Sequence, residues 1–162
     1  MIVVSDTSVL VNLAWLNQLD ILPALYGEII VPSAVWEEIV ILGAGKMGSQ
    51  EIAHATWIKR RSPKNESLID SLRQTLDSGE AEGIALALEV NADLLLIDER
   101  LGRMTAKYFD IEIIGLLGIL IQAKQEGFID QIKPLVDQLR FEIGFRISSQ
   151  LYQEILRLAS EM

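Results

Sequence analysis

The chain has 162 residues, a length that fits one domain with a sizeable hydrophobic core. It contains no cysteine, which excludes a disulfide framework, a zinc–thiolate site and a thiol nucleophile. Its 23 acidic and 14 basic residues give a net charge of −9, which taken alone argues against nucleic-acid binding. A protein that uses carboxylates to bind metal cations also has a negative net charge. The positions of the acidic residues must therefore decide between the two interpretations.

The N-terminus and the apolar runs indicate where the protein resides. The opening MIVVSDTS has no basic start and turns polar after four residues, unlike a secretory signal. The longest apolar runs are far shorter than the roughly twenty residues needed to span a bilayer. We therefore expect a soluble, cytoplasmic protein with no membrane partner.

Short β-branched runs alternate with helical patterns along most of the chain. In chain order, the pattern predicts a strand at 2–4, a helix from 7, a strand at 28–31, a helix at 33–43, a glycine-rich loop at 43–50, a strand at 56–60, helices at 67–76 and 78–90, a strand at 94–97, a helix at 100–108, a strand at 111–114 and helices to 162. Ser5 or Asp6 is placed to cap the first helix, and Ser78 to cap the helix over 78–90.

This order of elements predicts an α/β fold with a central, mostly parallel sheet. We expect one domain over residues 1–162, with a core at about 1–125. Two C-terminal helices at about 129–162 are expected to cover the sheet or to form an oligomer contact.

Four acids stand near strand ends in this prediction. Asp6 directly follows the first strand and Asp98 directly follows the most apolar one, so both should reach the same rim of a parallel sheet. Glu38 and Glu80 lie on neighbouring helices that can point back over that rim. Carboxylates brought together in this way repel one another unless a hard cation such as Mg²⁺ or Mn²⁺ neutralises them or some take up protons. Two such ions can promote in-line hydrolysis of a phosphodiester.

Each acid also has an ordinary structural explanation. Asp6 can be merely an N-cap and Asp98 a turn residue. Glu80 lies in a first helical turn, where the helix dipole favours acids without any function. The inference therefore rests on the set of four and not on any single residue.

Four segments together resemble the motifs of PIN domains. These segments are SDTS at 5–8, VPSAVWEEI at 31–39, SGEAEGIALALEV at 78–90 and LLLIDERLGR at 94–103. They are most similar to the VapC-type toxin ribonucleases and to a prokaryotic PIN branch found beside them. The resemblance implies a three-layer α/β/α PIN-like fold and a Mg²⁺ or Mn²⁺ cofactor. It also implies that the catalytic and metal-binding residues are Asp6, Glu38, Glu80 and Asp98.

The sequence departs from the VapC-type pattern at the third acid, which is Glu instead of Asp, and after the fourth, where ERLGR follows. Because both acids bind hard cations, we expect metal binding to persist. Ser8 and Asn12 are supporting candidates that either orient a water or ligand or serve the structure alone. Glu99 is either a supporting acid near the site or simply exposed.

Basic and aromatic residues are the next candidates for nucleic-acid contacts. Arg100 and Arg103 lie close to Asp98 in sequence and are the candidates for binding the scissile phosphate. The dense basic cluster at 59–64 is either a solvated run or a contact for RNA phosphates or an antitoxin's acidic tail. The tryptophans Trp15, Trp36 and Trp57 are too dispersed for a base-stacking platform, so we expect them in the core or an interface.

These observations favour a metal-dependent endoribonuclease, the toxin of a prokaryotic toxin–antitoxin pair, with RNA as substrate. The expected partners are a small antitoxin protein and a second copy of the chain, with the apolar helices at 9–25 and 115–123 as plausible homodimer contacts. Two alternatives stay open, namely a non-catalytic PIN-like binding or regulatory module and a nuclease for structured DNA.

Overall fold

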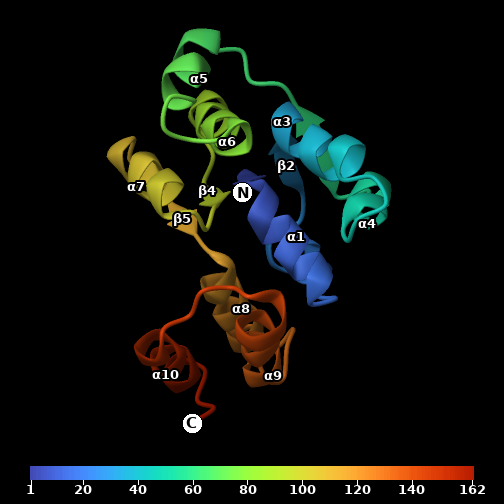
Figure 1. Ribbon diagram of the computed structural model, residues 1–162, viewed down its shortest axis with the longest axis vertical. Helices are drawn as coiled ribbons and strands as arrows, with labels where there is room; N and C mark the ends of the chain where they lie inside the picture. Colours follow the sequence, from blue (N-terminus) through green and yellow to red (C-terminus); the bar gives the residue numbers. More distant parts are fainter.

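The computed structural model describes residues 1–162 and contains a five-stranded sheet in the order β3–β2–β1–β4–β5 (Figure 1). The strands are β1 (Val3–Ser5), β2 (Ile29–Pro32), β3 (Ile58–Arg61), β4 (Leu94–Leu96) and β5 (Ile113–Ile114). All four neighbouring pairs are parallel. The predicted α/β fold is confirmed, and the sheet is wholly parallel.

Helical segments make up most of the remaining chain. They are α1 (Thr7–Trp15), α2 (Ile21–Tyr26), α3 (Ser33–Trp36), η1 (Glu37–Leu42), α4 (Ser49–His54), α5 (Glu66–Leu72), α6 (Ser78–Glu89), α7 (Arg100–Tyr108), α8 (Leu116–Gln125), α9 (Lys133–Gln138), η2 (Leu139–Ile143) and α10 (Ser149–Leu158). The segments η1 and η2 are wider π-helical turns. None of these helices is both long and apolar enough to cross a membrane.

Three helical details differ from the sequence prediction. The predicted helix at 33–43 changes from α to π geometry at Glu37. The predicted glycine-rich loop ends early, because α4 already begins at Ser49. Helix α2 was not separately predicted, because its six residues, ILPALY, carry a proline and too short a pattern to show helical periodicity.

Side chains alternate between the two faces of the sheet and so build two cores. On β1, Val3 packs into the larger core, formed with α1, α2, α8 and the C-terminal helices, whereas Val4 packs into the smaller core with α5, α6 and α7. On β4, Leu96 and Leu95 divide in the same way. Because successive strand residues point to opposite faces, both faces need helical cover, and three layers result.

The C-terminal segment packs against the rest of the chain. Figure 1 shows α8, α9 and α10 gathered at one end of the molecule. Val136, Leu139 and Ile155 of this segment are buried in the larger core. Within the chain these helices therefore act as a cover. Leu13 of α1 and Ile119 of α8 are both 0% exposed, so these two side chains belong to the core of the chain.

A buried carboxylate fastens the end of this cover. The Glu161 side chain is only 8% exposed and lies 2.9 Å from the Lys124 ammonium. It also accepts hydrogen bonds from the backbone N–H groups of Ile132 and Lys133 at the start of α9. Burial acts to raise the pKa of Glu161, but the hydrogen bonds and the ammonium outweigh it and lower the pKa below the ordinary 4.5.

We expect Glu161→Gln to lower the free energy of unfolding by about 1–3 kcal/mol at pH 7, the range for hydrogen bonds to a charged group. A lowered folded-state pKa gives stability that is present above about pH 4.5 and is lost as the pH falls through the folded value. Urea denaturation at pH 7 and at pH 3 should therefore show a smaller difference between the two proteins in acid than at neutral pH.

Glu154→Gln is the matched control, because Glu154 pairs with Arg157 at the exposed surface and should change stability little. Equal effects of the two substitutions at pH 7 would contradict the assigned role of Glu161.

Candidate functional site

A cleft of about 1800 Å³ lies at the carboxyl ends of β1 and β4, and all four predicted acids line it. The strand register explains how two of them meet. Ser5 is paired with Leu96, and the Asp6 N–H donates to the Leu96 carbonyl over 2.9 Å. Asp6 and Asp98 therefore leave adjacent parallel strands at the same edge of the sheet.

Asp6 stands at the N-cap position of α1 but does not perform the predicted capping role. Its side chain makes no capping hydrogen bond to the helix. The residue is only 4% exposed, and it lines the cleft. Its carboxylate is therefore available for a ligand in the cleft.

Glu38 is the exposed member of the set and is placed by η1. Its Oε2 accepts a hydrogen bond from the Thr7 hydroxyl over 2.9 Å. Gly79 allows this part of the cleft to close up. A methyl group added there would lie 3.2 Å from Asp6 Oδ1 and 3.4 Å from Glu38 Oε2, so both carboxylates face the same spot on α6.

Glu80 has a structural task as well as a place in the cleft. The Glu80 N–H donates to Asp77 Oδ1 over 2.8 Å, and Glu80 Oε1 accepts from the Asp77 N–H, which forms a reciprocal capping box. The sequence prediction of Ser78 as the cap is thus wrong by one residue. The other oxygen, Glu80 Oε2, is buried without any hydrogen-bond partner.

Asp98 is fixed by the start of α8 and by α7. Its Oδ1 accepts the Leu116 N–H over 2.9 Å, while its Oδ2 is buried without a partner. Arg103 donates from Nη1 to the Ile97 carbonyl over 3.0 Å and so stands beside Asp98. Gly115 has to be glycine here, because a methyl group would lie 2.5 Å from Asp98 Oδ1 and 2.7 Å from Arg103 Nη1.

The electrostatics of the cleft disfavour bare carboxylates. Burial raises the pKa of Asp6 to about 7, with Asp77, Glu38 and Asp98 adding to the shift and the Thr7 N–H opposing it. Burial together with Asp77 and Asp6 raises the pKa of Glu80 to about 8. Burial also raises the pKa of Asp98, although the Leu116 N–H and Arg103 act against it. Ionisation of these three buried acids is therefore disfavoured unless a cation lies close to them.

The acids fit a hard cation by chemistry but are not drawn into a tight cluster. No three acidic, histidine or cysteine side chains lie close enough together to hold one metal ion. The donors are all carboxylate oxygens, which Mg²⁺ and Mn²⁺ prefer. Two of them, Glu80 Oε2 and Asp98 Oδ2, are buried with no other partner, which is the condition that a bound cation would relieve.

The supporting and substrate-binding candidates also line the cleft, namely Ser8, Asn12, Glu99, Arg100 and Arg103. Their surroundings differ. The Ser8 hydroxyl is buried without a partner, Glu99 and Arg100 are exposed, and Arg103 is held at the wall by Ile97. The basic cluster at 59–64 does not line the cleft, since β3 carries most of it at the far edge of the sheet.

Sequence reasoning missed three charged cleft residues. Asp77 contacts Glu80 directly, whereas Lys46 and Arg146 line the cleft from segments distant in sequence. For Asp77 the signal was present, because an N-cap acid three residues before Glu80 is the usual capping-box spacing. Nothing in the local sequence shows that a C-terminal arginine reaches this edge of the sheet.

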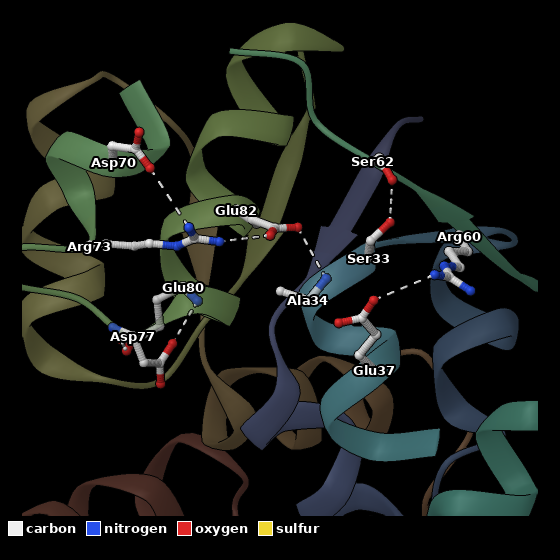
Figure 2. Close-up of polar contacts among 10 residues, drawn as sticks. All are labelled: Ser33, Ala34, Glu37, Arg60, Ser62, Asp70, Arg73, Asp77, Glu80 and Glu82. Carbon is white, nitrogen blue, oxygen red and sulfur yellow. Dashed lines mark hydrogen bonds and ion pairs between the residues drawn. The ribbon is translucent and has the colours of Figure 1, made fainter. Parts of the chain in front are cut away.

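Glu82 couples the helices that carry Glu38 and Glu80. From α6 it accepts the Ala34 N–H at the start of α3 over 3.0 Å and pairs with Arg73 over 3.3 Å (Figure 2). Figure 2 also shows the Glu37–Arg60 contact, which ties this helical segment to β3, and the Ser33–Ser62 contact, which ties it to the residue after β3. Asp70 adds a second contact to Arg73. The positions of α3 and α6 are therefore fixed by side chains outside the cleft.

A parallel sheet with acids at the carboxyl ends of its central strands defines an α/β protein whose cleft is lined by carboxylates suited to a cation. A family model described as "PIN domain" matches residues 2–161, and the chain therefore belongs to the PIN-domain family. No curated protein and no solved structure is significantly similar to it. PIN domains are generally nucleases that act on nucleic acid with divalent metal ions.

We expect Asp6→Asn and Glu80→Gln to stabilise the metal-free protein at pH 8. The pKa of each acid is raised on folding, so the folded state binds protons that the unfolded chain releases, and stability falls as the pH rises from about 4 to 8. One pKa unit corresponds to about 1.4 kcal/mol, so a neutral amide should add about 1–3 kcal/mol. Denaturant titrations in EDTA at pH 4 and pH 8 measure this.

Glu38→Gln serves as the control, because Glu38 is exposed and the same chemical change there should have a small effect. A loss of stability in Asp6→Asn at pH 8, or a gain that persists at pH 4, would show that burial of the charged form does not limit stability here.

Proposed function

We propose that this protein is a metal-dependent endoribonuclease that hydrolyses RNA phosphodiester bonds. The observation that carries the proposal is the arrival of four acids from separate elements at one cleft, two of them with buried, unpartnered carboxylate oxygens. Family membership supports a nuclease, and the match of the motifs to VapC-type toxins favours RNA.

Asp6, Glu38, Glu80 and Asp98 would hold Mg²⁺ or Mn²⁺. Such ions activate a water for attack on a phosphate and stabilise the leaving oxygen. The chain's own groups prepare this site. The Thr7 hydroxyl orients Glu38, the Leu116 N–H orients Asp98, and Asp77 fixes Glu80 in its helical turn.

The arginines of α7 supply positive charge beside the acids. Arg103 is anchored on the Ile97 carbonyl and makes no ion pair, which leaves its remaining N–H groups for a phosphate. Arg100 makes no side-chain hydrogen bond or ion pair and lines the same cleft. Ser8 and Asn12 lie along α1 on the cleft side and would contact the bound strand or its water.

We expect the purified protein to cleave RNA in Mg²⁺ or Mn²⁺, and EDTA to stop the reaction. Asp6→Asn and Asp98→Asn should each reduce the cleavage rate roughly 100-fold or more, because each removes a charged group from the reacting centre. Rates are measured on a labelled single-stranded RNA.

Glu38→Gln should also reduce the cleavage rate, and Glu37→Gln is its matched control, since Glu37 is adjacent in sequence but pairs with Arg60 outside the cleft. If the Asp6→Asn, Asp98→Asn and wild-type proteins cleave RNA at the same rate, the activity comes from a contaminating nuclease and the proposal is wrong.

A non-catalytic binding module is the second candidate, and one observation favours it. No three acids stand close enough to share an ion, so the metal-free cleft is not a preformed cage. If calorimetry shows no Mg²⁺ or Mn²⁺ binding and RNA stays intact, the chain is a binding module. The same assay with flapped and branched DNA tests the remaining alternative, a nuclease for structured DNA.

We further propose that the protein acts in the cytoplasm as the toxin of a toxin–antitoxin pair, restrained by a small antitoxin, and that it pairs as a homodimer. An unpartnered apolar stripe on α7 supports a protein partner. Leu101, Met104 and Tyr108 are 51%, 56% and 82% exposed and share one helical face. Leu101 lines the cleft, so a partner on this stripe would stand beside the acids.

We expect the product of a short neighbouring reading frame to copurify with this protein and to suppress its cleavage of RNA. Met104→Glu should weaken that complex while leaving RNA cleavage intact, because Met104 does not line the cleft. Light scattering on the isolated chain reports the homodimer. Copurification that Met104→Glu leaves unchanged would place the partner elsewhere.

A further inference from the structure

Helix α1 runs along the cleft from the acids to an exposed indole. Ser8, Asn12 and Trp15 are spaced by four and three residues, share one helical face, and all line the cleft. Asp6 precedes the first residue of this helix and Trp15 is its last. At 1.5 Å per residue, the indole is about 14 Å along the helix from Asp6.

Trp15 is not a core residue. It is 49% exposed, whereas Leu10 and Leu13 of the same helix are fully buried. Trp36 and Trp57 do pack against the larger core, so the sequence expectation of a core or interface role is confirmed for those two. The same cleft is lined by exposed Leu42 and Met47 and by Phe145 of the C-terminal segment. An aromatic ring kept half in solvent in a cleft that other apolar side chains also line indicates a ligand surface.

The same cleft contains positive charge that the chain does not use. Lys46, Arg100 and Arg146 line it, and none of their side chains makes a hydrogen bond or an ion pair. Elsewhere five cations are engaged in ion pairs, namely Arg60, Arg73, Lys124, Lys133 and Arg157. In a chain of net charge −9, unpaired cations beside an apolar ring are complementary to an anionic ligand with flat apolar faces.

From this arrangement we propose that Trp15 stacks on a base of a single-stranded RNA, a few nucleotides from the phosphate held at the acids. Lys46 and Arg146 contact the phosphates that flank this base. Proteins bind single strands by stacking aromatic side chains on the bases and by contacting the phosphates with cations. In a duplex the bases stack on one another, so their faces are not accessible to the indole. This proposal rests on the proposed function in one respect, namely that the bound strand continues from Trp15 to the acids where it is cleaved.

The test measures binding separately from cleavage. Fluorescence anisotropy is recorded with a labelled single-stranded RNA and the Asp98→Asn protein in Mg²⁺. Adding Trp15→Ala should weaken binding roughly tenfold, since base–aromatic stacking accounts for about 1–3 kcal/mol per base. Trp15→Phe should recover most of the affinity. Phe128→Ala is the matched control, because Phe128 is 47% exposed but does not line the cleft.

An abasic site walked along the RNA separates stacking from a general loss of structure. In the protein that keeps Trp15, removing the base at one position of the RNA should weaken binding. In the Trp15→Ala protein, removing the same base should cause no further loss of affinity. Arg146→Ala should weaken binding at every abasic position equally. The proposal is overturned if the Trp15→Ala protein keeps the same abasic profile, if duplex RNA binds as tightly as the single strand, or if Trp15→Ala changes only the oligomeric state.

If the Asp98→Asn protein binds RNA with this Trp15-dependent profile but the wild type never cleaves it, the nuclease proposal fails and the stacking site stands. If the wild type cleaves RNA with no dependence on Trp15, the nuclease proposal stands and the stacking site fails.

Discussion

The structure is organised around carboxylates that the fold forces out of water. Parallel pairing of β1 with β4 brings Asp6 and Asp98 to one edge, and helices on both faces of the sheet then bury them. Burial raises the pKa of Asp6, Glu80 and Asp98, so each carboxylate must find a proton, a hydrogen-bond donor or a cation. Backbone N–H groups satisfy only part of this need, and the carboxylate oxygens left without a partner favour a cation in the cleft.

The same constraint requires contacts that hold the elements around the cleft together. Acids that repel one another push their elements apart, so contacts outside the cleft have to hold these elements in place. Glu82 does this between α6 and α3 with Arg73 as its counter-charge, and Arg103 holds the start of α7 to the end of β4. Glycine at positions 79 and 115 then lets backbone and carboxylates approach closely. Contacts around the cleft thus stabilise the fold, and they offset the destabilising effect of the buried acids in the cleft.

Much of this architecture can be predicted from local sequence patterns. Apolar runs mark the strands within a residue or two, and an acid directly after such a run in a parallel sheet has to appear at its carboxyl edge, as Asp6 and Asp98 do. Three features escape such reasoning because they depend on distant contacts. The π turn at Glu37 forms within a continuous helical pattern, the Asp77 cap competes with an equally suitable Ser78, and Arg146 reaches the cleft only because α8 to α10 fold back over α1.

The negative charge of the chain, which at first argues against nucleic acid, is compatible with it once charge is considered by position. The cleft contains buried acids without a cation partner, and it also contains Lys46, Arg100 and Arg146, which have no carboxylate partner. A molecule with few phosphate contacts and a net charge of −9 gains little from long-range attraction to RNA. Under the proposed function, affinity for a single strand would then depend more on stacking contacts, which are less sensitive to salt. A half-exposed indole at the end of α1 is the group in this cleft best suited to supply one, because stacking needs no charge and every base offers a face.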